Sequence, residues 1–217
     1  MKSLIEFLKK SEACAPALKW LETQLDAQTA WVNCERGDWL LWLLAKLEID
    51  RKKLVLLACK CARSSLHLVL KGEERPRIAI ETAEAWARGE ATLGEVNRAA
   101  IAAQEAVYSA SSRASYEAAA YVLTSYASVH AANAAGYAAR TADVANAADR
   151  VGYAANAAAR AADVANAADR VGYAANAAGY AARTAAHAAH ANAIRKDISF
   201  EEVQKLLENR TEKEANS

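Results

Sequence analysis

The sequence predicts an all-α protein, and three observations support this fold class. Ala, the residue with the highest helix propensity, makes up about a quarter of the 217 residues. Only two residues are Pro, and none follows Pro76, so the second half lacks the strongest helix breaker. That half also has no sustained run of β-branched residues. We expect a Trp-centred helical domain over residues 1–91, a long Ala-rich helical hairpin or bundle over 92–195, and a C-terminal helix and tail over 196–217.

The N-terminal domain is expected to contain short helices around one apolar segment. Pro16 suits the first turn of a helix that continues to Leu25. Residues 39–47 read WLLWLLAKL, and Asp38 is the expected N-cap of the helix that they form. Because this segment is apolar on nearly every side, we predict that it forms the centre of the core.

Two further helices complete the predicted N-terminal domain. Asp50 can cap a helix over residues 51–70. The loop that starts at Gly72 breaks this helix, and Pro76 leads into the next one, which Gly89 stops. The spacing of apolar residues turns one face of the first of these helices inward: Leu54, Leu57, Ala58 and Cys61.

The rest of the chain reads as helix with few interruptions. Thr92 and Glu95 form a capping box, and from there to about Arg195 nothing obliges the chain to leave the helical state. A single helix of this length would measure about 150 Å, so we expect at least one reversal. Ser199 and Glu202 predict the start of the last helix.

The Ala-rich segment contains internal repeats. Residues 142–158 recur at 162–178, and residues 131–142 recur at 174–185. An offset of 20 residues turns a continuous helix by about 200°, so a turn between the copies would restore equivalent faces. Four glycines are candidates for such turns or for close helix crossings, and the sequence leaves both uses open: Gly136, Gly152, Gly172 and Gly179.

Charged pairs recur with the same repeat, as Asp149–Arg150 and Asp169–Arg170. They suit either a ladder of ligands for an extended partner or a solubilising stripe that fixes helix register, and we favour the stripe. A repeat of 20 residues also suits a pentapeptide β-solenoid. That fold is disfavoured here, because mostly Ala or Val would occupy the inward positions that bulky residues fill in such a coil.

The charge balance excludes several classes of partner. The chain has 27 Lys and Arg residues against 26 Asp and Glu residues, a formal net charge of +1. A protein that binds nucleic acid or an anionic membrane normally carries a basic excess or a basic face, so we expect neither partner. Arg, Asp or Asn interrupts the Ala-rich tract every few residues, which argues against a transmembrane helix.

The expected compartment is the cytoplasm. The first residues include Glu6 and several Lys, whereas a secretory signal peptide needs an unbroken apolar stretch. Without export, cysteines are expected to remain reduced, and we predict buried free thiols at all four positions: Cys14, Cys34, Cys59 and Cys61.

Other polar groups have an ordinary interpretation. His187 and His190 lie at helical i, i+3 spacing, but no Cys, Asp or Glu in that stretch completes a metal site, so we interpret them as a solvated stripe. Glu81 and Glu84, near Arg77, are interpreted as a solvated ion-pair face. We therefore expect no catalytic residue, no cofactor and no metal.

The Trp residues supply the best candidates for binding. All five lie within the first 86 positions and should mostly belong to the core. Trp and Arg are also enriched at the centres of protein interfaces. Because Arg36 and Asp38 lie next to Trp39 in the sequence, we take these three residues as the candidate partner-binding rim.

Several segments carry a family resemblance: 35–47 (ERGDWLLWLLAKL), 58–66 (ACKCARSSL), 77–92 (RIAIETAEAWARGEAT) and 194–207 (IRKDISFEEVQKLL). With the Ala- and Tyr-rich repeats between them, they resemble the immunity protein family of bacterial polymorphic toxin systems and phages. The Arg-Gly-Asp-Trp element is the more specific part. The resemblance implies an all-α protein that neutralises a toxin by occlusion, and it supplies no set of functional residues.

We therefore expect a non-catalytic cytoplasmic protein that binds a toxin or another macromolecular partner. The alternative is a structural or assembly protein, for instance a phage-encoded one, whose helices form a homo-oligomer. An enzyme is disfavoured, because the sequence has no phosphate-binding glycine loop, no metal-spaced Cys and His set, and no nucleophile with an obvious base.

Overall fold

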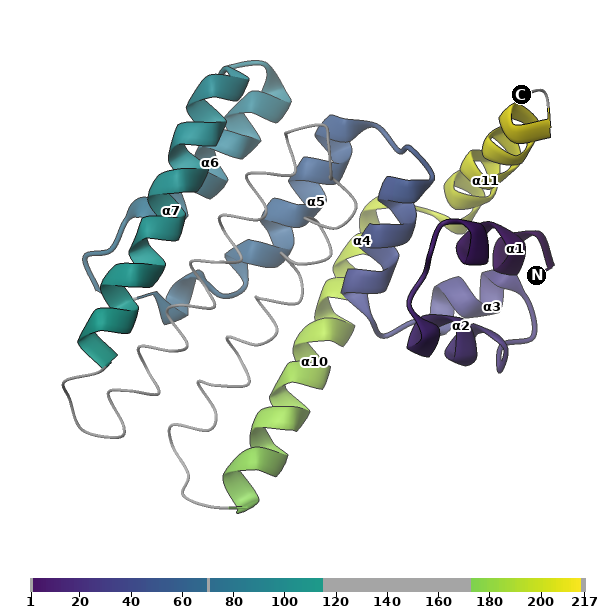
Figure 1. Cartoon of the computed structure of the whole chain (residues 1–217), viewed down its shortest axis with the longest axis horizontal. Coiled ribbons are helices and arrows are strands. Elements are labelled where there is room, and N and C mark those ends of the chain that lie inside the picture. Colours follow the sequence, from purple (N-terminus) through teal and green to yellow (C-terminus); the bar gives the residue numbers. More distant parts are fainter. Residues whose placement is uncertain (1, 70, 115–172, 216–217) are drawn as a thin grey trace.

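A computed structural model of the chain describes residues 2–69, 71–114 and 173–215 (Figure 1). Within these ranges every regular element is a helix, which confirms the all-α prediction. The helices are α1 (Lys2–Lys10), α2 (Ala15–Leu21), α3 (Ala27–Asn33), α4 (Gly37–Lys46), α5 (Arg51–Arg63), the 3₁₀ helix η1 (Leu66–Leu68), α6 (Arg75–Arg88), α7 (Leu93–Ala114), α10 (Tyr173–Asp197) and α11 (Phe200–Ala215).

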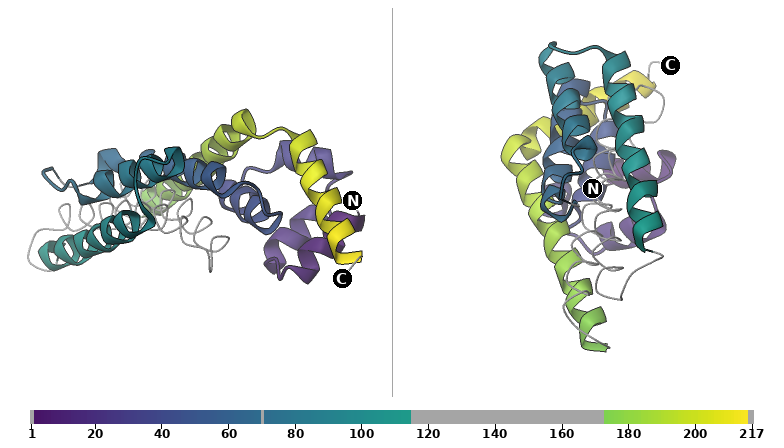
Figure 2. Two further views of the ribbon diagram at one scale, coloured as in Figure 1. Left: turned by 90° about the horizontal axis from the view of Figure 1, so that it is seen from above. Right: turned by 90° about the vertical axis from the view of Figure 1, so that its left-hand side faces the viewer.

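The helices form an elongated arrangement with two ends. Helices α1, α2 and α3 lie at one end, and α11 lies at the same end (Figures 1 and 2). Helices α6 and α7 pack on each other at the opposite end, and α6 also packs on α5. Between the two ends, α10 packs mainly along α4. The C-terminal helices therefore return to the N-terminal part of the fold.

One contiguous apolar cluster runs through the described helices. Leu41 and Leu44 of α4 are completely buried in it, as are Val55 of α5 and Ile80 of α6. Ile194 of α10 joins the same cluster. Apart from the half-buried Leu43, the Leu residues of the 39–47 segment lie in the centre of the core, as predicted. The two Trp residues of this segment are only half-buried and pack against the edge of the cluster.

Most of the predicted helix starts are confirmed, but two helices end earlier than predicted, because α2 ends at Leu21 and not at Leu25, and α5 ends at Arg63 and not at residue 70. The Asp50 carboxylate accepts a hydrogen bond from Lys53 N at 2.9 Å and caps α5. Gly89 ends α6 in the left-handed conformation, with φ 86°. At the start of α7, Thr92 N donates to Glu95 Oε2 at 2.7 Å and Glu95 N donates to Thr92 Oγ1 at 3.3 Å. This reciprocal pair is the predicted capping box.

The start of α11 is also confirmed, because Glu202 N donates to Ser199 Oγ at 3.2 Å. The prediction that Asp38 is the N-cap of α4 is wrong. Arg36 occupies the cap position and Asp38 lies in the first turn, where its carboxylate accepts hydrogen bonds from the Arg36 guanidinium and not from the helix backbone.

Arg195 fixes α10 against α3. Its Nη1 donates to the carbonyl oxygens of Trp31 at 3.1 Å and of Cys34 at 2.7 Å. The last carbonyls of a helix have no partner within that helix, so these bonds satisfy groups that the short α3 leaves open. Lys53 of α5 and Glu202 of α11 form a further link, with Nζ 2.8 Å from Oε1.

Part of the repeat analysis lies outside the described residues. This applies to Gly136, Gly152 and Gly172 as candidate turns, and to the Asp149–Arg150 and Asp169–Arg170 pairs. Gly179 lies inside α10 and does not form a turn. The domain boundaries near residues 91 and 195 stay a prediction.

Candidate functional site

A cavity of about 700 Å³ opens where α11 faces the N-terminal helices α1–α4. Its walls are mostly apolar. Leu8, Leu21 and Trp31 come from α1, α2 and α3, and α11 adds Phe200 and Val203. Cavities of this size and character commonly bind small ligands or apolar side chains of other molecules.

The three residues of the predicted rim all line this cavity. The Arg36 guanidinium donates two hydrogen bonds to the Asp38 carboxylate, from Nε to Oδ1 at 2.9 Å and from Nη2 to Oδ2 at 2.6 Å. Its Cζ lies 4.6 Å from the centroid of the Trp39 ring, a cation–π geometry. Trp39 in turn contacts Trp20, with 6.0 Å between ring centroids. The fold therefore brings the three together, and their binding role stays a prediction.

The electrostatic state of this rim follows from the same contacts. The hydrogen bonds to Asp38 raise the pKa of Arg36 above its usual value, so its positive charge is fixed. Asp38 is only 9% exposed, and a bidentate Arg–carboxylate pair satisfies a buried carboxylate well. The pair holds the guanidinium in place over Trp39.

Two histidines of α10 lie next to Asp38, and the sequence analysis assigned them to the wrong environment. The interpretation of His187 and His190 as a solvated stripe is wrong, because they are 6% and 4% exposed. They lie on the face of α10 that packs on α4, and His187 Nδ1 is 3.5 Å from Asp38 Oδ1. Their i, i+3 spacing was visible in the sequence. No signal in a single Ala-rich sequence shows which face of such a helix is covered.

The hydrogen bonds of His190 select its tautomer. Ser64 Oγ lies 2.9 Å from His190 Nε2 and 2.7 Å from the carbonyl oxygen of Cys61. A hydroxyl has one proton, and the carbonyl can only accept, so Ser64 donates to Cys61 and His190 Nε2–H donates to Ser64. His190 Nδ1 is then an unprotonated acceptor. It is buried and has no partner among the described residues.

Burial sets the protonation state of the groups around this contact. It lowers the pKa of His187, and, with repulsion from the protonated form of His187 as a smaller cause, it lowers the pKa of His190 from 6.5 to about 4. Burial likewise raises the pKa of the Cys61 thiol to about 12 and that of Cys34 to about 11. Both imidazoles are therefore neutral, and both thiols protonated, at neutral pH.

The four cysteines are free, and three of them are buried as predicted. The prediction is wrong for Cys14, which is exposed because it occupies the N-cap position of the short helix α2 at the mouth of the cavity. In the part of the chain that the structure describes, no group of three or more His, Cys, Asp and Glu side chains could hold a metal ion. Among the helices of these described residues, none combines the length and the apolarity needed to cross a membrane.

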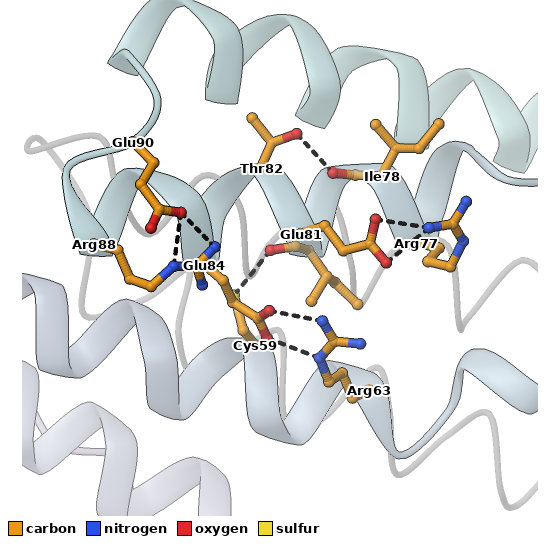
Figure 3. A network of polar contacts seen from close by, with 10 residues as sticks. Cys59, Arg63, Arg77, Ile78, Glu81, Thr82, Glu84, Arg88 and Glu90 are labelled. Atoms are coloured by element: carbon orange, nitrogen blue, oxygen red, sulfur yellow. Dashed lines mark hydrogen bonds and ion pairs between the residues drawn. The ribbon is translucent and has the colours of Figure 1, made fainter.

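The acidic row on α6 belongs to a surface ion-pair network (Figure 3). None of its residues lines the cavity. Arg63 of α5 pairs with Glu84 of α6, with Nη2 2.6 Å from Oε2. Arg77 pairs with Glu81 one turn further along α6, at 2.7 Å. The interpretation as a solvated ion-pair face is therefore confirmed. Arg63 was not anticipated as a partner, because the pairing of α5 with α6 is a tertiary contact.

Comparison with known proteins gives one family match. Residues 46–151 match the family model described as "Imm-5 like putative immunity protein". This confirms the family resemblance over a segment that includes α5, α6 and α7, and the Arg-Gly-Asp-Trp element at residues 36–39 lies outside that segment. No curated protein and no solved structure matches the chain significantly. The residues that line the cavity all lie outside the matched segment, within 3–43 and 200–211.

Proposed function

From the match of residues 46–151 to an immunity family model, we propose that this chain is a non-catalytic binding protein that neutralises a toxin, or another macromolecular partner, by occlusion. The family match is the single observation that carries this role. The free cysteines suit a reducing compartment, and we place the protein in the cytoplasm on that ground.

The cavity between α11 and α1–α4 is the proposed contact site. Residues that dominate protein interfaces are typically Trp, Tyr and Arg in or beside pockets, and here Trp39 and Arg36 stand at the edge of an apolar cavity. Because the cavity lies outside the matched segment, we assign that segment to the scaffold. The two ends of the chain then supply the surface that is specific to the partner.

The protonation states support a non-catalytic role. The thiols of Cys34 and Cys61 are held protonated by burial, and a catalytic cysteine needs a thiolate. Ser64, at the C-terminal end of α5, contacts His190, but its proton is accepted by the carbonyl of Cys61, and His190 is buried in the α4–α10 contact. Among the described residues, neither arrangement activates a nucleophile.

The test is an affinity pull-down from the native host with the full chain as bait. We compare the wild type with Trp39→Ala and with Trp86→Ala, a matched control. Both Trp residues are half-buried and lie under an Arg side chain, and only Trp39 lines the cavity. Wild type and Trp86→Ala should capture the same protein in similar amounts. Trp39→Ala should capture at least about tenfold less of it.

The captured protein is then expressed alone and together with this chain. Growth arrest by the captured protein, relieved by co-expression, is the predicted result. A captured protein that is harmless would contradict the immunity role. Recovery of this chain alone as its own partner would favour the assembly alternative.

A further inference from the structure

The charges on the cavity walls are strongly unequal. Three exposed carboxylates line it: Glu12 between α1 and α2, Asp26 at the N-cap of α3, and Glu208 on α11. The one cation among its lining residues is Arg36, which the bidentate contact with Asp38 already neutralises.

None of the three carboxylates is compensated by a salt bridge within the described ranges. Asp26 accepts a hydrogen bond from Thr29 N at 2.7 Å, and Glu208 accepts one from Gln204 Nε2 at 2.9 Å. These donors are neutral. The cavity therefore combines apolar walls with a negatively charged mouth, although the whole chain has a formal net charge of +1.

We propose that this cavity binds a basic amphipathic helix of the protein partner, with apolar side chains in the cavity and Lys or Arg side chains at its mouth. This assignment rests on the proposed function and names the partner's chemistry. An amphipathic helix that docks into an apolar groove places its anchors at i, i+3, i+4 and i+7, and its remaining positions face the rim. Carboxylates on three sides of the mouth favour cations there, and they accelerate the approach of a basic partner at low salt.

Two synthetic helical peptides probe the cavity directly. Both carry Leu at the anchor positions, and the others are all Lys in one peptide and all Glu in the second. Isothermal titration of the full chain at low ionic strength should give a Kd about tenfold lower for the Leu/Lys peptide, because three surface ion pairs contribute modestly to affinity. Added salt should reduce this difference.

Matched variants separate the two components of the site. Ala17→Trp adds a bulky side chain to the cavity wall on α2 and should strongly weaken the binding of both peptides, whereas Ala85→Trp, at a half-buried position on α6 outside the cavity, should not. The double variant Glu12→Lys/Glu208→Lys should remove the preference for the Leu/Lys peptide. Its control, Glu6→Lys/Glu212→Lys, changes exposed residues of α1 and α11 that do not line the cavity and should keep the preference.

Equal affinity for the two peptides, or unchanged binding in Ala17→Trp, would overturn this assignment. Circular dichroism and thermal melting establish that each variant is folded. If Ala17→Trp does not fold, the charge variants still test the assignment, because they leave the apolar cavity walls unchanged. The peptides require no toxin. If the chain prefers the Leu/Lys peptide but does not relieve growth arrest, only the immunity role is contradicted. If it relieves growth arrest but binds the two peptides equally, only the proposed basic helix is contradicted.

Discussion

At Gly37, the first residue of α4, the absence of a side chain permits the contact with α10. A Cβ added there would lie 2.5 Å from His190 Cβ and 3.1 Å from Ala191 N. Real Cβ atoms do not approach so closely, and part of what they would meet is the backbone of α10. The Arg36–Asp38 pair and the two buried histidines flank this crossing, so Gly37 also positions the polar contacts beneath the candidate site.

Gly37→Ala should therefore lower the free energy of unfolding by about 1–3 kcal/mol, because it overpacks a close helix crossing. Gly94→Ala is the matched control. A Cβ at Gly94, in the first turn of α7, meets no atom closer than Arg98 Nη1 at 3.6 Å, and Ala has the better helix propensity. Urea unfolding of both variants checks this. An equal effect at the two glycines would mean that α10 does not pack against α4 as described.

His190 should make stability depend on pH. Its folded pKa of about 4 lies below the 6.5 of an unperturbed histidine, so the unfolded chain binds more protons between these values. The contribution of the neutral His190 to the free energy of unfolding is therefore complete above pH 6.5 and is lost as the pH falls toward 4. At pH 5 this histidine should cost about 2 kcal/mol relative to pH 7.

Urea unfolding of His190→Gln at the two pH values measures that contribution. The decrease in the free energy of unfolding between pH 7 and pH 5 should be about 2 kcal/mol smaller in His190→Gln than in the wild type. In His67→Gln it should equal that of the wild type, since His67 is exposed. If His190→Gln retains the full pH dependence of the wild type, His190 is not a buried neutral histidine. His187, whose pKa is lowered in the same direction, should account for part of the remaining slope.

At the scale of elements, the helices could be predicted from the sequence with most of their starts, whereas α2 and α5 end earlier than predicted, at Leu21 and Arg63. The signals at Asp50, Gly89, Thr92 and Ser199 are local, and each cap forms as expected. Asp38 was misassigned because Arg36 engages the carboxylate that a cap would need. Which face of α10 is buried could not be read, because an Ala-rich helix has no contrast between its faces.

The packing of α10 has a direct mutational test. Ile194 is 1% exposed and joins the shared core, so Ile194→Ala should cost about 2–5 kcal/mol of unfolding free energy. Ile101→Ala makes the same change at a 51% exposed position of α7 and should cost less than about 0.5 kcal/mol. Thermal or urea melts compare them. Similar costs at the two sites would mean that α10 is not part of the core.

At the scale of the whole molecule, the fold class was predictable and the candidate site only in part. Arg36, Asp38 and Trp39 could be identified because they are neighbours in the sequence and combine residue types common at interfaces. The cavity itself could not be predicted from the sequence. Its opposite wall comes from α11, more than 150 residues along the chain from α4, and only the tertiary fold brings those segments together.

The proposed function and its site make a stoichiometric prediction. A protein that acts by occlusion neutralises one partner molecule per copy, whereas a catalyst neutralises many. The bulky side chain that Ala17→Trp adds to the cavity wall should then weaken neutralisation, while Ala85→Trp should leave it unchanged.

The most direct measurement is a titration of the captured toxin's activity with the purified full chain. The residual activity should fall linearly and reach its minimum at about one equivalent, and Ala17→Trp should require a large excess to reach the same level. Complete loss of activity far below one equivalent would show turnover and contradict the binding role. Full neutralisation by Ala17→Trp at one equivalent would contradict the cavity as the site of contact.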